Sequence, residues 1–243
     1  MGSYLWFMAA LLVCGTLSAL ASAKVNKTYA KYGKIRSRSG MTGYDTAYRL
    51  MQANGVTDVK IGRVSGTLTD HYHPLQAIVN LSDTTYGEAS IAAAAAVAAH
   101  EIGHVIQNKR GYLFYRLRTA LVPAVNFGSR LAMPLVLVGL LLDSGVFLAR
   151  NSDLGYYLAM LGVILYGASF LFTVVTLPVE LDASRRAKRM LAEEGILTTE
   201  EMAGAGQVLS AAAMTYLAAM FTSLVYFLRF LFFVMTMFGR RRD

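Results

Sequence analysis

The sequence predicts an α-helical protein that crosses a membrane several times and carries a small α+β domain. Of its 243 residues, 55% are hydrophobic and only 16% are charged, a composition typical of membrane proteins. The segments 3–23, 131–148 and 154–177 each carry at most one charge. Each approaches the roughly 20 residues that cross a hydrocarbon core about 30 Å thick. Short apolar runs separated by turns lie between the first two segments and predict the small domain.

The first segment has two interpretations. It ends in Ala21, Ser22 and Ala23, as a cleaved signal peptide often does, but no basic residue precedes the apolar run. We therefore expect residues 1–23 to be a retained transmembrane anchor. Cys14, the only cysteine, lies inside it, so no disulfide can form within the chain.

The small domain begins with a helix and continues as short strands. Residues 41–54 carry apolar side chains at mostly helical spacing and stop at Gly55. Residues 59–82 indicate strands, with turns at Ser65 and Gly66 and near Pro74. The alanine-rich residues 90–107 then predict a helix with Ser90 as its N-cap.

The end of that helix carries the motif HEIGH, with His100 and His104 four residues apart and Glu101 beside the first histidine. Two histidines at this spacing share a helix face, so both imidazoles can reach one metal ion. Zinc lowers the pKa of water to about 7, and a nearby carboxylate can take the proton of that water. The motif predicts a zinc hydrolase; the alternative is two histidines on a polar helix surface.

A catalytic zinc usually takes a third protein ligand and leaves one position open. The candidates are His71, His73, Glu180 and Asp182. We expect Glu180 in the first turn of a helix, with Thr176 as cap and Pro178 at its start. There it either binds the metal or merely stabilises the helix dipole.

The final apolar stretch, residues 208–238, is too long for one straight crossing and contains Arg229. Either a buried helix of the small domain precedes a crossing helix, or the stretch forms a re-entrant hairpin. The expected order is an anchor (1–23), a region with the HExxH helix (24–130), two transmembrane helices (131–178), a third-ligand helix with its connection (179–207) and C-terminal apolar membrane-associated helices (208–243).

The positions of the basic residues predict how the chain is oriented in the membrane. Six of them follow the first apolar segment at once and none precedes it, which places this side in the cytoplasm. Two further crossings return Glu180 to the side that carries HEIGH, so the ligands can meet. The net charge of +8 comes mostly from such clusters beside the membrane, and it suits anionic lipid headgroups better than nucleic acid.

Nearly the whole chain resembles the YugP-like membrane zinc metallopeptidases, also described as neutral zinc metallopeptidases. The segments that carry the resemblance are SGTLTDHYHP (65–74), AAAVAAHEIGHVIQ (94–107), ALVPAVNFGSR (120–130), TLPVELDASRRA (176–187) and VLSAAAMTYLAA (208–219). The resemblance implies a zincin-like catalytic domain of the gluzincin type. It also implies one Zn²⁺ per chain on His100, His104 and Glu180, with Glu101 as general base.

The sequence departs from more distant HtpX-like proteases, which place an aspartate four residues after the ligand glutamate. Ser184 occupies that position here. We expect Asp182 to pair with an arginine among Arg185, Arg186 and Arg189 rather than to face the metal, because it is rotated about 200° from Glu180 on a helix.

Other roles follow from the resemblance or from residue type alone. Gluzincins lay an extended substrate beside a strand before the active helix, and the matching residues are Ala77, Ile78, Val79 and Asn80. His71 and Tyr216 are candidates for stabilising the oxyanion. Each of these residues could equally be structural.

These observations predict a membrane-embedded zinc endopeptidase in a bacterial cytoplasmic membrane, with its site on the cytoplasmic side. Its partners would be the lipid bilayer and protein or peptide substrates, in particular membrane or membrane-proximal proteins. The alternative is a catalytically silent metal-binding scaffold or regulatory subunit. A transporter is disfavoured because the predicted spans are almost free of charge.

Overall fold

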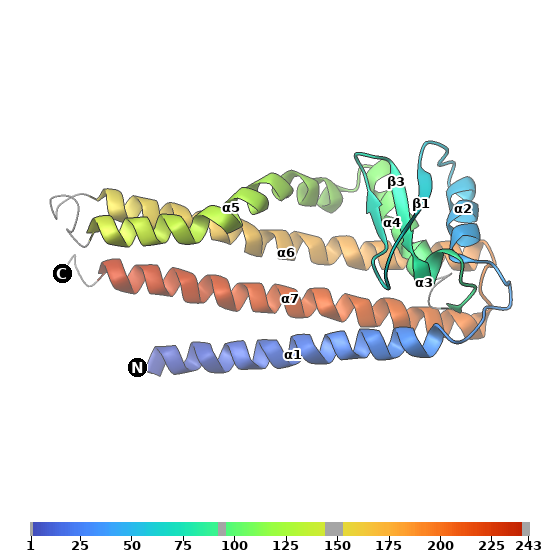
Figure 1. The fold of residues 1–243 in the computed structure, drawn as a ribbon, viewed down its shortest axis with the longest axis horizontal. Coiled ribbons are helices and arrows are strands. Elements are labelled where there is room, and N and C mark those ends of the chain that lie inside the picture. The colour runs from blue at the N-terminus through green and yellow to red at the C-terminus, as the bar shows by residue number, and fades with distance from the viewer. Residues whose placement is uncertain (1, 92–95, 144–152, 240–243) are drawn as a thin grey trace. The chain divides into compact units, whose positions relative to one another are not determined.

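The computed structural model describes residues 2–91, 96–143 and 153–239. The chain forms two compact units. The first comprises residues 1–18, 117–176 and 217–243, and the second comprises residues 19–116 and 177–216. Four of the described helices contribute residues to both: α1 (Gly2–Tyr32), α5 (Leu113–Asp143), α6 (Leu154–Glu193) and α7 (Thr199–Gly239) (Figure 1).

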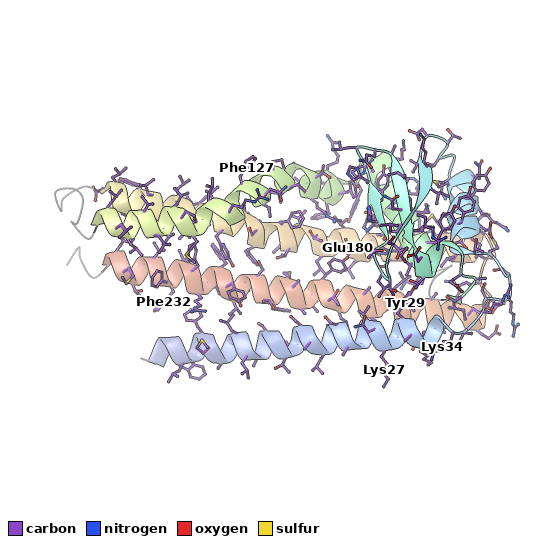
Figure 2. The ribbon with its side chains drawn as sticks, viewed as in Figure 1. Lys27, Tyr29, Lys34, Phe127, Glu180 and Phe232 are labelled. Carbon is purple, nitrogen blue, oxygen red and sulfur yellow. The ribbon has the colours of Figure 1, made fainter. Side chains whose placement is uncertain are left out.

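The first unit consists of helices suited to a membrane. Among the described residues, α1, α6 and α7 are long and apolar enough to cross, and α5 (Leu113–Asp143), bent by 43° between Gly128 and Arg130, would add a fourth crossing. A Cβ on Gly162 of α6 would lie 2.6 Å from the carbonyl oxygen of Ala132 on α5, so the two backbones approach closely, as small residues permit. Phe232 of α7, labelled in Figure 2, lies against Phe7 of α1, with ring centroids 5.6 Å apart.

The expected start of a helix near Glu180 was wrong. Helix α6 runs through Thr176 and contains Pro178 in its interior, so Glu180 lies within a helix of 40 residues. An interior proline costs about 3 kcal/mol. Continuing the helix keeps the remaining backbone groups paired, which matters most where no water can reach them.

The hairpin interpretation of residues 208–238 was also wrong. Helix α7 spans Thr199–Gly239 without a break in these described residues. Its residues up to Tyr216 belong to the second unit and those from Leu217 to the first. This division matches the other interpretation, in which a buried helix of the small domain leads into a crossing helix, except that the two parts form one helix.

The second unit contains a three-stranded sheet with the order β1-β3-β2. Strand β3 (Ile78–Ser82) pairs in parallel with β1 (Lys60–Val64) and antiparallel with β2 (His71–His73). Val79 and Leu81 of β3 are fully buried in a core shared with helix α4 (Ala98–Lys109). Figure 1 shows α4 beside the strands, with α2 (Gly43–Ala53) next to them and the short α3 (Asp83–Tyr86) following β3.

The helix predicted over residues 41–54 is confirmed as α2. Thr42 caps it through a reciprocal pair of bonds with Asp45, and Gly55 follows with a φ of +68°. A left-handed residue after a helix end favours glycine, which lacks the Cβ that would clash.

Helix α4 runs from Ala98 to Lys109. Ser90 pairs with Arg36 in an isolated bridge, and its role as an N-cap stays a prediction, because a cap there would contact the residues that directly follow it. Residues 92–95, which carry most of the predicted alanine-rich helix start, lie outside the described residues.

The expectation of a substrate edge strand at Ala77, Ile78, Val79 and Asn80 was wrong. Residues 78–80 of β3 pair with β1 on one side and with β2 on the other. Their main-chain groups are already hydrogen-bonded to the two neighbouring strands, so an extended peptide cannot pair there. The outer strands of the described sheet are β1 and β2.

Candidate metal centre

Two helices of the second unit bring the metal-binding motif and Glu180 together. His100 and His104 stand one turn apart on α4, with ring centroids 4.7 Å apart, and Glu180 projects from α6 (Figure 2). Glu180 Oε2 lies 3.1 Å from His100 Nε2 and 3.5 Å from His104 Nε2. One ligand atom from each residue can be chosen such that all three lie within 4.8 Å of one another.

This donor set fits a zinc ion. Tetrahedral zinc with bonds of about 2.0–2.1 Å separates its ligands by roughly 3.4 Å, close to the two distances at Glu180. Two imidazole nitrogens and one carboxylate oxygen form a known catalytic ligand set with an open fourth position. Glu180 is only 2% exposed, and a carboxylate buried this deeply requires a cationic partner. Zn²⁺ would provide that partner.

The outer ring nitrogens of the histidines contact neutral polar groups. His100 Nδ1 lies 3.2 Å from Ser184 Oγ, and His104 Nδ1 lies 3.0 Å from Gln107 Oε1. A hydrogen bond donated by Nδ1–H leaves the Nε2 lone pair for a metal. The Ser184 hydroxyl can either donate or accept, so it is compatible with this tautomer of His100. Both histidines are therefore oriented with Nε2 toward Glu180.

Glu101 is a buried carboxyl group beside the candidate ligands. Burial raises its pKa from an ordinary value of 4.5 to about 7, with further raising by the charges of Glu180 and Asp70 and lowering by His100 and His71. A carboxyl group poised near neutral pH can both accept and release a proton under physiological conditions.

The expectations for Asp182 and Ser184 can be compared with their contacts. Asp182 pairs with Arg186, with Oδ2 and Nε 2.5 Å apart, as predicted. Ser184, which stands where the more distant relatives have an aspartate, contacts His100 through its hydroxyl group. Ser184 thus hydrogen-bonds to the histidine without adding a negative charge.

His71 and Tyr216 remain predictions of oxyanion stabilisers. His71 lies at the start of β2, where its Nδ1 donates to the Thr69 carbonyl at 2.9 Å. Its Nε2 then accepts from the Asn80 amide at 3.1 Å. With both ring nitrogens engaged by Thr69 and Asn80, the ring offers no free N–H to a substrate in this arrangement. Tyr216 lies on α7.

Two residues near the centre did not emerge from the sequence. Gln107 follows His104 by three residues, a spacing that puts both on one helix face and could have revealed the contact. Tyr115, at the start of α5, has its ring centroid 6.4 Å from that of His104. Gly111, with a φ of +62°, lies in the turn that redirects the chain from α4 to α5, and the turn sets this contact.

The chain is similar in sequence to known proteins. The family model described as "Putative neutral zinc metallopeptidase" matches residues 6–235. The "Putative membrane protease YugP" of Bacillus subtilis (strain 168) is 44% identical over 214 residues, which cover 88% of this chain and 90% of that protein. No solved structure matches the chain significantly. With the family model covering almost its full length, the chain belongs to the neutral zinc metallopeptidase family.

Proposed function

We propose that this protein is a membrane-embedded zinc endopeptidase that hydrolyses peptide bonds of membrane or membrane-proximal proteins. The observation that carries the proposal is the convergence of His100, His104 and Glu180 beside the buried Glu101. Membership in a zinc metallopeptidase family and the resemblance to a membrane protease support the same reaction class.

Glu101 would act as the general base and then as the general acid. Zinc held by His100, His104 and Glu180 would supply a Lewis acid that polarises the peptide carbonyl and makes water more acidic. Glu101 would accept a proton from the attacking water and return it to the amine that leaves when the C–N bond breaks. Its pKa near 7 suits both transfers.

We further propose that the site works on the cytoplasmic side of a bacterial cytoplasmic membrane. The basic residues that follow the anchor belong to the second unit, which also holds the metal centre, and all are exposed: Lys24, Lys27, Lys31, Lys34, Arg36 and Arg38. Lys27 and Lys34 are labelled in Figure 2. Such a cluster beside an apolar helix favours the cytoplasmic side.

The test compares zinc content and peptide cleavage of the purified wild type, Glu101→Gln and Glu88→Gln in detergent. Glu88 is exposed, so its variant controls for the same chemical change away from the site. We expect about one zinc per chain in all three proteins, with cleavage reduced at least about 100-fold only in Glu101→Gln, as for the loss of a general base. Zinc binding without any cleavage that depends on Glu101 would instead support the scaffold, and a zinc-free wild type would refute the proposal.

A further inference from the structure

Gln107 is a fully buried polar residue of α4 that contacts a proposed metal ligand and helix α6 at the same time. Its Oε1 lies 3.0 Å from His104 Nδ1. Its Nε2 donates to the carbonyl oxygen of Val179 at 2.7 Å and to Oδ2 of Asp182 at 2.9 Å. With no exposed surface, the amide depends on these three partners, since an unpaired buried polar group costs about 1–3 kcal/mol.

The partners leave the amide only one orientation. A backbone carbonyl and an ionised carboxylate only accept hydrogen bonds, so the NH₂ group must face Val179 and Asp182. Oε1 therefore faces His104, and a carbonyl oxygen can only accept. The proton of the neutral imidazole must then sit on Nδ1, which leaves the lone pair of Nε2 directed toward Glu180.

The contact continues beyond Gln107. Asp182 is held by Arg186 on the next turn of α6, so a chain of bonds runs from His104 through Gln107 and Asp182 to a guanidinium group. We infer that Gln107 is a positioning residue, which fixes the tautomer and ring orientation of His104 by anchoring it to α6. This inference rests on the proposed function, in which His104 binds zinc.

Residue 107 must carry an amide because one end of its side chain accepts a hydrogen bond and the other end donates. One end must accept from an imidazole N–H and the other must donate to a carboxylate. Glutamate keeps the acceptor but brings a second carboxylate to the contact that now measures 2.9 Å, where like charges repel. Exchanging the two groups, with Gln107→Glu and Asp182→Asn together, restores one amide and one carboxylate at that contact.

The experiment measures zinc affinity by competition with a chelator for full-length protein in detergent. The variants are Gln107→Met, Gln107→Glu, the exchange of both groups, and Gln52→Met. Gln52 is exposed on α2 and controls for the same change in side chain. We expect Gln107→Met to bind zinc about 10–100-fold more weakly, as is typical when a partner of a ligand histidine is lost. Gln107→Glu should also bind zinc more weakly, because its second carboxylate oxygen is repelled by Asp182. The exchange should recover part of this loss, because it removes the repulsion at residue 182 but leaves the Val179 carbonyl without its donor. Gln52→Met should bind like the wild type.

Two further measurements separate positioning from general destabilisation. The visible absorption spectrum of the Co²⁺-loaded protein reports ligand geometry and should change in Gln107→Met but not in Gln52→Met. The thermal midpoint of the chelated proteins reports folding alone. If Gln107→Met does not fold, recovery of affinity in the exchange relative to Gln107→Glu decides the question.

The outcomes distinguish this inference from the proposed function. A wild type that binds no zinc would refute both. A wild type that binds zinc, with unchanged affinity and an unchanged Co²⁺ spectrum in folded Gln107→Met, would refute the role of Gln107 alone. Failure of the exchange to recover any affinity over Gln107→Glu would do the same.

Discussion

Gly103 of α4 lies against the backbone of Ala183 on α6. A Cβ at Gly103 would stand 2.7 Å from the Ala183 carbonyl oxygen and 3.1 Å from its Cα. Real Cβ atoms essentially never come so close to backbone, which cannot rotate away as a flexible side chain can. The absence of a side chain at Gly103 therefore allows α4 and α6 to approach until His100 and His104 meet Glu180.

The first prediction follows from this contact. Gly103→Ala should force the two helices apart, lower stability by about 1–3 kcal/mol as overpacking does, and weaken zinc binding. Gly206→Ala is the matched control, because a Cβ there has no neighbour within 4 Å. Thermal unfolding and chelator competition measure the two effects. Wild-type zinc affinity in Gly103→Ala would show that the close approach is not needed for the site.

Zinc removal gives the second prediction. A ligand that binds only the folded state stabilises it, by about 4 kcal/mol when its free concentration is 1,000 times the Kd. Chelation should therefore lower the thermal midpoint of the wild type. Glu180→Gln, which keeps the volume of the side chain but removes its charge, should respond much less. An unchanged midpoint of the wild type after chelation would contradict the proposed ligand set.

The sequence revealed part of this site because part of it is local. His100 and His104 are four residues apart on one helix, so helix geometry alone predicts that they face one metal. Glu180 is 80 residues away from His100 in the sequence. The properties of the residues alone left it as one of four candidates for the third ligand, and the resemblance to a known family then favoured it. The contact between Gly103 and Ala183 that brings the two helices together has no signature in either segment.

The errors in the fold have similar causes. Pro178 favours a helix start in isolation, but a long apolar helix tolerates it, and α6 continues through it. The resemblance to gluzincins predicts that the strand before α4 is an edge strand. Strand β1 instead pairs with β3 in parallel, which puts β3 between β1 and β2. Strand order depends on such pairings between distant segments, which local patterns do not encode.

The buried carboxyl group of Glu101 predicts a pH dependence in the zinc-stripped protein. Its folded pKa of about 7 exceeds the ordinary 4.5, so the stability it contributes is fully present below about pH 4.5 and is lost as the pH rises through about 7. Glutamine cannot ionise. At about pH 8, the free energy of unfolding of zinc-stripped Glu101→Gln should therefore exceed that of the zinc-stripped wild type by at most about 3 kcal/mol. The variant should accordingly unfold at a higher temperature.

The same difference should shrink toward about pH 5, where the wild-type carboxyl group is mostly protonated. Thermal unfolding of both proteins across this range measures it, with Glu88→Gln as a control that should show no such trend because Glu88 is exposed. A difference that is constant with pH would mean that Glu101 is not buried in a neutral form.

The proposed orientation can be tested because the chain has a single cysteine, Cys14, which is buried. On a Cys14→Ser background, a membrane-impermeant maleimide should label Lys27→Cys in inverted vesicles but not in intact spheroplasts. Asp153→Cys, directly before α6 and expected on the opposite side, should show the reverse. Labelling of Lys27→Cys in spheroplasts would place the metal centre outside the cytoplasm.

The last prediction concerns the choice of substrate. The apolar run of α6 ends at Leu177, and Glu180 follows three residues later on the same helix, which is about 4.5 Å along its axis. A substrate held in the same bilayer therefore meets the site at a high effective concentration, while a soluble peptide must first reach the membrane surface.

In vesicles, the reconstituted protein should cleave a sequence tethered by a transmembrane helix at least about ten times faster than the same sequence as a free peptide. Glu101→Gln, measured in parallel, identifies cleavage by contaminating proteases. In detergent, where the tether no longer concentrates the substrate beside the enzyme, the two rates should converge. Equal rates in vesicles would show that membrane anchoring does not select the substrate, although the assignment of the metal centre would stand.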